Sequence, residues 1–168
     1  EKYKIKGIVD KNKSERKFMG YKILGSDHNL KDLLSENDFG LVCVGQIKSP
    51  NIRIKLFDLL KNQSIKIATI KSKNSIISRN TIIKKGTITM HNTVINSGVE
   101  IGSNCIINTG SIIEHDSTIG NNCHISTGSI INGNVTIEDN VFIGSGSVVY
   151  HNTIIKKNSI IPAGTIIR

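Results

Sequence analysis

A group of residues near the middle of the chain has the side chains and the spacing of a proton-transfer site. His115 is flanked by Glu114 and Asp116, and Gly133 follows His115 by 18 residues. A neutral imidazole beside a carboxylate can act as a general base. A glycine leaves its backbone N–H open to approach, which suits a developing oxyanion. The set predicts proton abstraction coupled to attack on a carbonyl, provided that the fold brings His115 and Gly133 together.

The elements that must position these residues form a repeat of six. From residue 75 to the C-terminus the chain reads in sixteen hexads, among them SIIEHD (111–116) and SIINGN (129–134). The third place is Ile or Val except at Thr89, and the first is always Ser, Thr, Val or Cys. Places four to six are rich in Gly, Asn, Asp and Ser, which turn the chain easily. Short strands separated by turns at this period predict a parallel β-helix.

The repeat resembles that of the hexapeptide-repeat acyltransferases, in which three hexads make one triangular coil. The resemblance implies coils of about 18 residues, about five of them, wound left-handed against the usual crossover rule. His115 and Gly133 would then occupy the same corner of successive coils, about one strand spacing (~4.8 Å) apart. His151 would lie one coil above Gly133 in the same column.

Side chains at the second place of each hexad point outward, because alternate residues of a strand face opposite sides. They form three columns: Ile76, Val94, Ile112, Ile130, Val148 and Ile166; Ile88, Ile106, His124, Phe142 and Ile160; and Ile82, Glu100, Thr118, Thr136 and Ile154. Two columns are apolar, apart from His124, and monomers rarely expose stripes that long. We therefore expect two faces to be buried against neighbouring subunits, as a closed threefold ring requires.

The composition and the distribution of charge exclude several classes of protein. The net charge is +9, yet neither Lys nor Arg occurs between Lys85 and Lys156, so the repeat lacks the basic stripe that nucleic-acid binding needs. No apolar run is long enough to cross a membrane, and no signal peptide is visible, which favours a cytoplasmic protein. Lys156 and Lys157 are either a phosphate contact or solvated turn lysines.

The cysteines and histidines indicate neither a disulfide framework nor a metal site. Only three Cys occur; Cys105 and Cys123 should stack in one inward column as small buried thiols of a reducing compartment. No two His combine a recognised ligand spacing with a Cys or carboxylate partner, so no metal is expected. His28 and His91 are expected to be ordinary surface residues.

The first seventy residues predict a small α/β domain, residues 1–70, ahead of a β-helix domain, residues 71–168. Strands are expected at 4–10, 40–45 and 64–70, and helices at 27–37 and 49–63, the second one starting at Ser49 and Pro50. This order predicts a parallel sheet, with ligands at the carboxyl ends of its strands. Asp10 and Gly45–Gln46 would lie there, although Asp10 could simply close a turn and Gly45 could simply end a strand.

A closer resemblance is carried by NTGSIIEHDSTIGNNCHISTGSIINGNVTIEDN (108–140). This segment is similar to bacterial sugar acetyltransferases that O-acetylate sialic acid or N-acetylate UDP-amino sugars; IVDKN, LVCVG and Asn51–Arg53 also fit. The resemblance implies a Rossmann-like sugar-nucleotide domain joined to a left-handed β-helix, a homotrimer, and acetyl-CoA lying between neighbouring coils. The glycine-rich turn of that family is absent from this chain, which begins at Glu1. We therefore expect an α/β domain that is either N-terminally incomplete or has lost this nucleotide site.

The resemblance also implies roles for single residues. His115 matches the base, Asp116 the acid that raises its basicity, and Gly133 the glycine whose amide meets the acetyl carbonyl. The remaining matches are His124 near the thioester, Gly144 and Ser145 beside pantetheine, Asn108 near the acceptor sugar and Asp10 near the nucleotide base.

We therefore expect an acetyl-CoA-dependent acetyltransferase that acts on a sugar or nucleotide sugar of bacterial surface glycans by direct transfer, without a metal. The residues do not choose between sialic acid O-acetylation and UDP-amino-sugar N-acetylation. Two alternatives are an acetyltransferase with a non-sugar acceptor and a non-catalytic β-helix that serves as a scaffold or binding surface.

Overall fold

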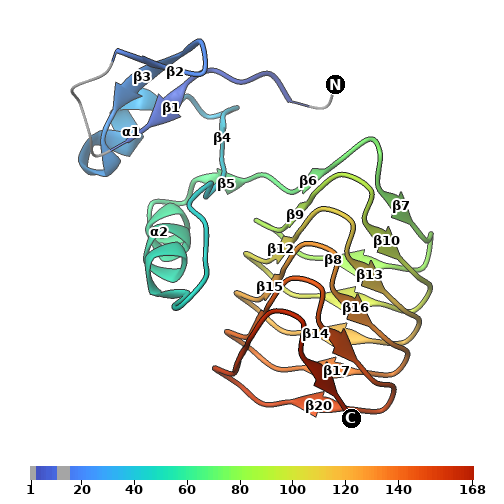
Figure 1. Ribbon diagram of the computed structural model, residues 1–168. Coiled ribbons are helices and arrows are strands. Elements are labelled where there is room, and N and C mark those ends of the chain that lie inside the picture. The colour runs from blue at the N-terminus through green and yellow to red at the C-terminus, as the bar shows by residue number, and fades with distance from the viewer. Residues whose placement is uncertain (1–2, 11–15) are drawn as a thin grey trace. The chain divides into compact units, whose positions relative to one another are not determined.

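Two-residue strands separated by turns wind most of the chain into a parallel β-helix (Figure 1). The structure is a computed structural model that describes residues 3–10 and 16–168. The chain divides into two compact units, residues 1–39 and residues 40–168. The β-helix belongs to the second unit.

Three parallel sheets form the sides of the β-helix. The first face consists of β7 (Ile76–Ile77), β10 (Val94–Ile95), β13 (Ile112–Ile113), β16 (Ile130–Ile131), β19 (Val148–Val149) and β22 (Ile166–Ile167). The second face consists of β6 (Ile70–Lys71), β9 (Ile88–Thr89), β12 (Ile106–Ile107), β15 (His124–Ile125), β18 (Phe142–Ile143) and β21 (Ile160–Ile161). The third face consists of β8 (Ile82–Ile83), β11 (Glu100–Ile101), β14 (Thr118–Ile119), β17 (Thr136–Ile137) and β20 (Ile154–Ile155).

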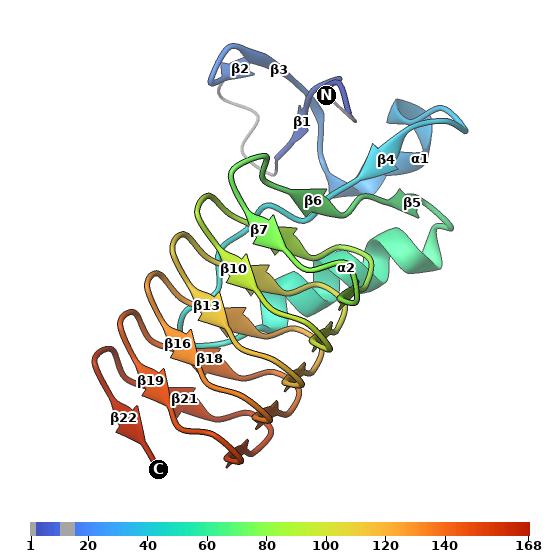
Figure 2. The ribbon, with the colours of Figure 1, turned by 90° about the vertical axis from the view of Figure 1, so that its right-hand side faces the viewer.

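The pairing register confirms the predicted columns. Ile112 lies opposite Ile130 on the first face, and Ile106 lies opposite His124 on the second, so each residue pairs with one 18 positions away. Figure 2 shows the first face as a regular stack of such strands. Stacked parallel sheets with this regular repeat fit the β-helix that the hexads predict and the left-handed form that the family resemblance implies.

The third-place side chains fill the axis of the coil. Ile95, Ile113 and Ile131 are fully buried. Cys105 and Cys123 are buried in the same core, as predicted, and both are free thiols. Because interiors pack as densely as organic crystals, one aliphatic residue per strand at this position fixes the height and register of each coil.

The chain turns each corner of the coil through a residue in the left-handed (positive φ) conformation at the sixth place of the hexad. Asn104, Asp116 and Asn122 have φ of 58°, 60° and 56°, and Gly110 has φ of 67°. Asn, Asp and Gly are the residues that adopt this conformation most readily. Asp116 is therefore a structural corner residue as well as a neighbour of His115.

The first unit is built on a three-stranded sheet of order β1–β3–β2, formed by β1 (Ile8–Val9), β2 (Lys17–Phe18) and β3 (Tyr21–Gly25). β1 is parallel to β3, and β2 joins β3 in an antiparallel hairpin through Met19 and Gly20, both with positive φ. A 3-10 turn, η1 (Asp27–Asn29), leads into the one-turn helix α1 (Leu30–Leu33).

The predicted single parallel sheet of the N-terminal region is not formed, so a Rossmann-like domain is not supported. The strand predicted at 4–10 shortens to β1, and the helix predicted at 27–37 ends at Leu33. β4 (Phe39–Gly40) and β5 (Lys66–Ile67) belong to a sheet of their own, apart from β1 and β3. The helix predicted at 49–63 is present as α2 (Asn51–Asn62), and the strand predicted at 64–70 is divided between β5 and β6.

Residues 41–45 are not a strand because their carbonyls bond to a side chain of α2. Arg53 is 1% exposed; its Nη1 donates to the carbonyls of Val42 and Val44 at 3.0 and 2.6 Å. Its Nη2 donates to the Asn104 carbonyl and to Asn104 Oδ1 at 3.2 and 2.9 Å. This network joins α2 and its preceding loop to the coil. It explains why residues 40–70 belong to the same compact unit as the coil, so that the boundary along the chain follows Phe39. The sequence analysis placed a domain boundary after residue 70.

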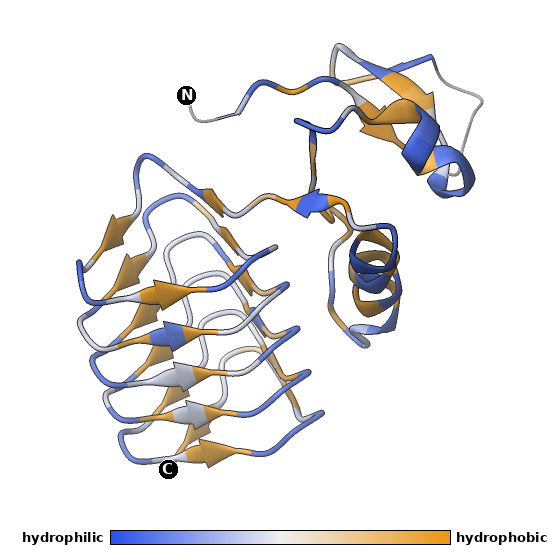
Figure 3. Cartoon of the chain, turned by 180° about the vertical axis from the view of Figure 1, so that it is seen from behind, coloured by the Kyte–Doolittle hydropathy of each residue, from blue (hydrophilic) through white to orange (hydrophobic). Residues whose placement is uncertain are grey.

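The chain itself covers part of the second face, whereas the first face stays open. On the second face His124 is buried and Ile106 is half-buried. On the first face the outward column is apolar throughout, and its end residues Ile76 and Ile166 are 69% and 61% exposed. Figure 3 shows the third face, hydrophobic at its two end strands and hydrophilic at β11, which carries Glu100. No helix among the described residues is long and apolar enough to cross a membrane.

Replacing Arg53 should destabilise the second unit. Arg53→Met leaves three backbone carbonyls and Asn104 Oδ1 without their donor, and a buried group that loses its partner costs roughly 1–3 kcal/mol. We expect a loss of at least that size in the free energy of unfolding, measured by urea titration. Arg79→Met, at an exposed turn of the coil, is the matched control and should change the same quantity by less than about 0.5 kcal/mol. Equal effects of the two substitutions would contradict an anchoring role.

Candidate active site

His115 and Gly133 lie on the same corner of successive coils, as the sequence predicts. The corner follows β13 in one coil and β16 in the next, and the backbone N–H of Asn134 donates to the His115 carbonyl at 2.9 Å. A Cβ built on Gly133 would lie 2.6 Å from His115 Nε2 and 2.7 Å from its Cε1. The imidazole therefore covers Gly133, and only glycine leaves room for it.

Asp116 orients the ring of His115. His115 Nδ1 lies 2.9 Å from Asp116 Oδ2. A carboxylate oxygen accepts, so Nδ1 carries the proton of this hydrogen bond, and Nε2 is the ring nitrogen that lies over Gly133. The position of Asp116 is fixed by the coil below it. Its Oδ1 lies against Gly98, and its backbone N–H donates to the Ser97 carbonyl at 3.0 Å. The pair has the form of an oriented general base.

Both members of this pair are accessible. The side chains of His115 and Asp116 are 64% and 68% exposed. Glu114, the other acid next to His115, instead accepts a hydrogen bond from Asn96 Nδ2 at 2.5 Å. Asp116 is therefore the acid that acts on His115.

His124 is placed differently from His115. It lies on β15, 7% exposed, with its ring edge-on to Phe142 at 5.2 Å between centroids. Nδ1 donates to the Gln46 carbonyl at 2.5 Å, so Nε2 is unprotonated and accepts from Asn108 Nδ2 at 3.1 Å. Burial lowers the pKa of His124, although the Gln46 carbonyl opposes the shift. Both ring nitrogens are engaged, and the sequence signals neither partner.

The other predicted site residues divide between different parts of the fold. Asn108, Gly144 and Ser145 lie at the corner that follows β12 and β18, where Ser145 Oγ is 2.9 Å from Ser126 Oγ. A Cβ on Gly144 would collide with the backbone of Ala163 in the next coil. This corner and the His115 corner are the two edges of the first face. Within one chain the structure therefore does not bring His115 and Gly133 together with Asn108, Gly144 and Ser145.

Lys156 lies at neither edge of the first face. It follows β20 on the third face, and its Nζ is 3.2 Å from Glu138 Oε1. Glu138 also accepts from the Lys157 N–H at 2.8 Å, and that bond and Lys156 lower the pKa of Glu138. Lys156 is therefore already paired with an acid in this chain.

Asp10 and Gly45 belong to different compact units. Asp10 is exposed, and its N–H donates to the Gly25 carbonyl at 3.0 Å. Gly45 is exposed in the loop before α2, with nothing within 4 Å of its Cβ position. Their predicted roles in binding substrate stay predictions.

The two cysteines inside the coil stay outside the chemistry. Cys105 Sγ lies 3.1 Å from the Gly120 carbonyl, and Cys123 Sγ lies 3.1 Å from the Glu138 carbonyl, both inside the coil. Their burial keeps them from acting as surface nucleophiles. Among the residues that the structure describes, no group of three His, Cys, Asp or Glu is arranged to hold a metal ion.

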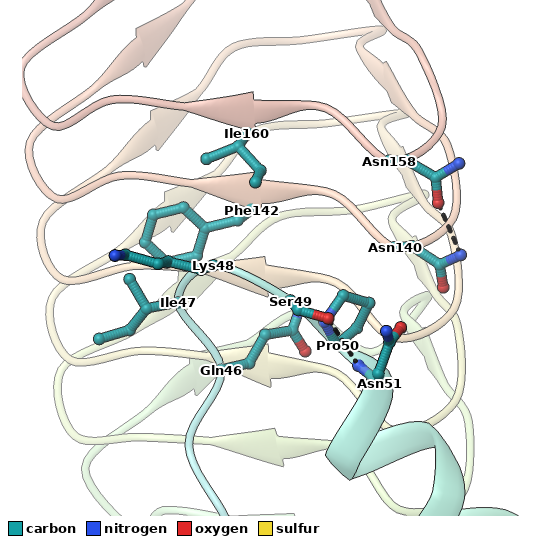
Figure 4. A pocket seen from close by; sticks show the side chains of 10 residues that line it. All are labelled: Gln46, Ile47, Lys48, Ser49, Pro50, Asn51, Asn140, Phe142, Asn158 and Ile160. Atoms are coloured by element: carbon teal, nitrogen blue, oxygen red, sulfur yellow. Dashed lines mark hydrogen bonds between the residues drawn. The ribbon is translucent and has the colours of Figure 1, made fainter.

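A pocket that the sequence analysis did not predict opens beside the second face. Loop residues 46–51 form one wall, and Asn140, Phe142, Asn158 and Ile160 form the other (Figure 4). Several of these residues were named in the sequence analysis, Gln46 among them as a possible ligand contact at the end of a strand, but not as parts of one pocket. The hexad pattern contains no signal for this pocket, because it depends on where the loop before α2 packs.

Comparison with known proteins gives one matching family. The family described as the GMPPB C-terminal domain matches residues 57–167. No curated protein matches the sequence.

Several solved structures share the fold. The acetyltransferase domain of PglB from Neisseria gonorrhoeae FA1090 has a TM-score of 0.89 at 23% identity, covering 96% of this chain and 78% of its own. WeeI from Acinetobacter baumannii AYE has a TM-score of 0.72 at 24% identity, covering 95% and 81%. A mutant of perosamine N-acetyltransferase from Caulobacter crescentus, in complex with CoA and GDP-perosamine, has a TM-score of 0.71 at 19% identity, covering 95% and 80%. At these identities the likeness concerns the fold.

The lowered pKa of His124 should make stability depend on pH. The folded state holds His124 neutral more strongly than the unfolded chain does, whose histidines titrate near about pH 6.5. The contribution of His124 to the free energy of unfolding is therefore complete above about pH 6.5. It is lost as the pH falls below that value, because the unfolded chain then binds a proton more readily than the folded one. We expect the urea midpoint of the wild type to fall over this range, and that of His124→Gln to fall less.

The control for this titration is His91→Gln, because His91 is exposed and Nδ1 bonds only to Ser72 Oγ at 2.8 Å. It should keep the pH dependence of the wild type. A His124 resonance that titrates at or above the ordinary value in NMR would contradict the burial effect.

Proposed function

The chain belongs to the family of the GMPPB C-terminal domain, and on this β-helix we propose that it transfers an acetyl group from acetyl-CoA to a sugar. One observation carries the proposal. His115 Nδ1 is held at 2.9 Å by Asp116 Oδ2 while Nε2 lies over Gly133. This places an oriented, accessible base beside a backbone that has no side chain.

The proposed reaction uses these residues directly. His115 Nε2 takes the proton of the acceptor hydroxyl or amine as that group attacks the acetyl carbon. Within residues 3–10 and 16–168, the Gly133 N–H donates no backbone hydrogen bond. It would therefore stabilise the oxyanion. The C–S bond then breaks, and the imidazolium returns the proton to the CoA thiolate. Asp116 stabilises the imidazolium, and no acyl-enzyme is needed.

The position of the remaining candidates supports assembly as a homotrimer. The His115 edge and the edge with Asn108, Gly144 and Ser145 border the apolar first face on opposite sides. If that face packs against neighbours in a closed ring, the His115 edge of one subunit meets the other edge of the next. Acetyl-CoA would bind between them, with Gly144 and Ser145 beside pantetheine, His124 near the thioester and Asn108 near the acceptor. Lys156 is the proposed phosphate contact.

The proposed ligands agree with those bound in similar structures. The PglB acetyltransferase domain was solved in complex with acetyl coenzyme A, with a TM-score of 0.86 to this chain, and the perosamine N-acetyltransferase was solved with CoA and GDP-perosamine. We propose a nucleotide sugar or sialic acid as acceptor. Asp10 and Gly45, which belong to different compact units, each stay a separate predicted contact to it. His115 and Gly133 can serve an amine or a hydroxyl acceptor alike.

His115→Ala should abolish transfer while leaving the fold intact. General-base catalysis contributes about 10²–10⁴-fold, so kcat should fall by at least 10²-fold in an acetyl-CoA consumption assay. Suitable acceptors are a sialic acid, its CMP form and UDP-amino sugars. His151→Ala is the matched control, because His151 is exposed on the same corner one coil above Gly133, and it should keep wild-type turnover.

Unchanged turnover in His115→Ala would refute the assignment of the base. Asp116→Asn should lower kcat less than His115→Ala does and shift the pH dependence of kcat/KM, because the imidazolium loses its partner.

Light scattering tests the assembly. The wild type should have the mass of three chains at micromolar concentration, and Ile130→Lys on the first face should dissociate it. Thr118→Lys, in the exposed outward column of the third face, should leave the mass unchanged. A monomeric wild type would contradict the proposed trimer.

A further inference from the structure

A second candidate binding site lies on a different corner of the coil from His115 and Gly133. The pocket of about 230 Å³ is enclosed by loop residues 46–51 and by Asn140, Phe142, Asn158 and Ile160. Asn140 follows β17 and precedes β18, so it stands at the corner between the third and second faces. The width of the third face separates this corner from Gly133.

Gln46 supplies a buried acceptor without a partner. It is 3% exposed, and its Nε2 donates to the Asn122 carbonyl at 3.0 Å. That bond fixes the carboxamide orientation, since only the nitrogen can donate to a carbonyl. Its Oε1 has no hydrogen-bond partner among the described residues, and Figure 4 shows the carboxamide directed toward Ser49 and Pro50 at the start of α2. A buried polar atom normally has a partner, so Oε1 calls for a donor from a ligand.

A ladder of asparagines supplies the complementary donor. Asn104 Nδ2 donates to Asn122 Oδ1, Asn122 Nδ2 to Asn140 Oδ1, and Asn140 Nδ2 to Asn158 Oδ1, at 2.9, 3.2 and 3.0 Å. Arg53 fixes the direction, because its guanidinium can only donate to Asn104 Oδ1. The last amide nitrogen, that of Asn158, donates to nothing within the described part of the chain. It stands at the wall of the pocket (Figure 4).

The rest of the lining is apolar apart from Lys48, Ser49 and Asn51. The side chains of Ile47, Pro50, Phe142 and Ile160 form the apolar part. Lys48 is the single charged residue, it is exposed, and the first turn of α2 has no acid to neutralise it. The pocket is smaller than the roughly 300–1,000 Å³ of sites for drug-sized ligands. One six-membered ring fits it better than a dinucleotide does.

From this arrangement we infer that the pocket is a second saccharide site, distinct from the proposed transfer site. A sugar hydroxyl both donates and accepts, which matches Gln46 Oε1 and Asn158 Nδ2 as the unpartnered acceptor and donor of two residues that line this pocket. The C–H face of a sugar ring packs on an aromatic side chain such as Phe142. Lys48 favours a sugar that carries a carboxylate. The site would hold an acidic sugar unit on the far side of Phe142 and Gln46 from His124, whose ring contacts both residues.

The test uses the full chain with glucuronic acid and glucose as matched probes. Both should shift the side-chain amide NMR signals of Gln46 and Asn158, and glucuronic acid should bind more tightly because of Lys48. Asn158→Asp keeps the acceptor for Asn140 but removes the donor, so it should weaken both sugars by about tenfold or more, roughly the loss of one hydrogen bond. His115→Ala should bind both sugars like the wild type.

Asn152→Asp is the matched control. Asn152 is exposed, has φ of 60° against 64° for Asn158, and likewise accepts from the Asn one coil earlier, at 2.7 Å from Asn134 Nδ2. It should bind both sugars normally. If Asn158→Asp does not fold, Phe142→Leu should show the same loss of binding. The inference is overturned if neither sugar shifts the two amide signals, if binding survives both pocket substitutions, or if His115→Ala abolishes it.

Discussion

Packing one aliphatic side chain per strand into the axis of the coil is the constraint on which the rest of the structure depends. Ile95, Ile113 and Ile131 are fully buried, and a slip of one residue would turn each of them outward. The register is therefore fixed by the core and not by the surface. This register also sets the position of every corner residue along the axis of the coil. The contact between His115 and Gly133 is therefore a consequence of the register.

Much of the coil and its catalytic candidate could be predicted because both depend on this short repeat. The outward columns, the inward cysteines and the stacking of His115 under Gly133 all follow from counting residues, and the pairing register bears them out. Asp116 could be recognised as the partner of His115 because it is adjacent in sequence. Its second task, the left-handed turn at φ 60°, is compatible with the first because Asp tolerates this conformation.

The regions that could not be predicted depend on contacts between distant residues. The apolar run at 40–45 has the composition of a strand, but Arg53 takes the carbonyls of Val42 and Val44. His124 stood out as polar in an apolar column, yet its partner Gln46 lies 78 residues away. A periodic pattern states which residues face outward and carries no information on what will cover them. The loop before α2 therefore decides both the environment of His124 and the shape of the adjacent pocket.

The triangular repeat also governs how this chain can change in length. Inserting or deleting six residues within the coil would rotate everything after it by one side of the triangle, moving an apolar column onto a polar side. A change of 18 residues preserves the orientation but alters the number of rungs. Such a change is harmless to the His115 and Gly133 pair only when it occurs before or after both of them. Indels in evolution or engineering should therefore be whole rungs placed outside residues 115–133.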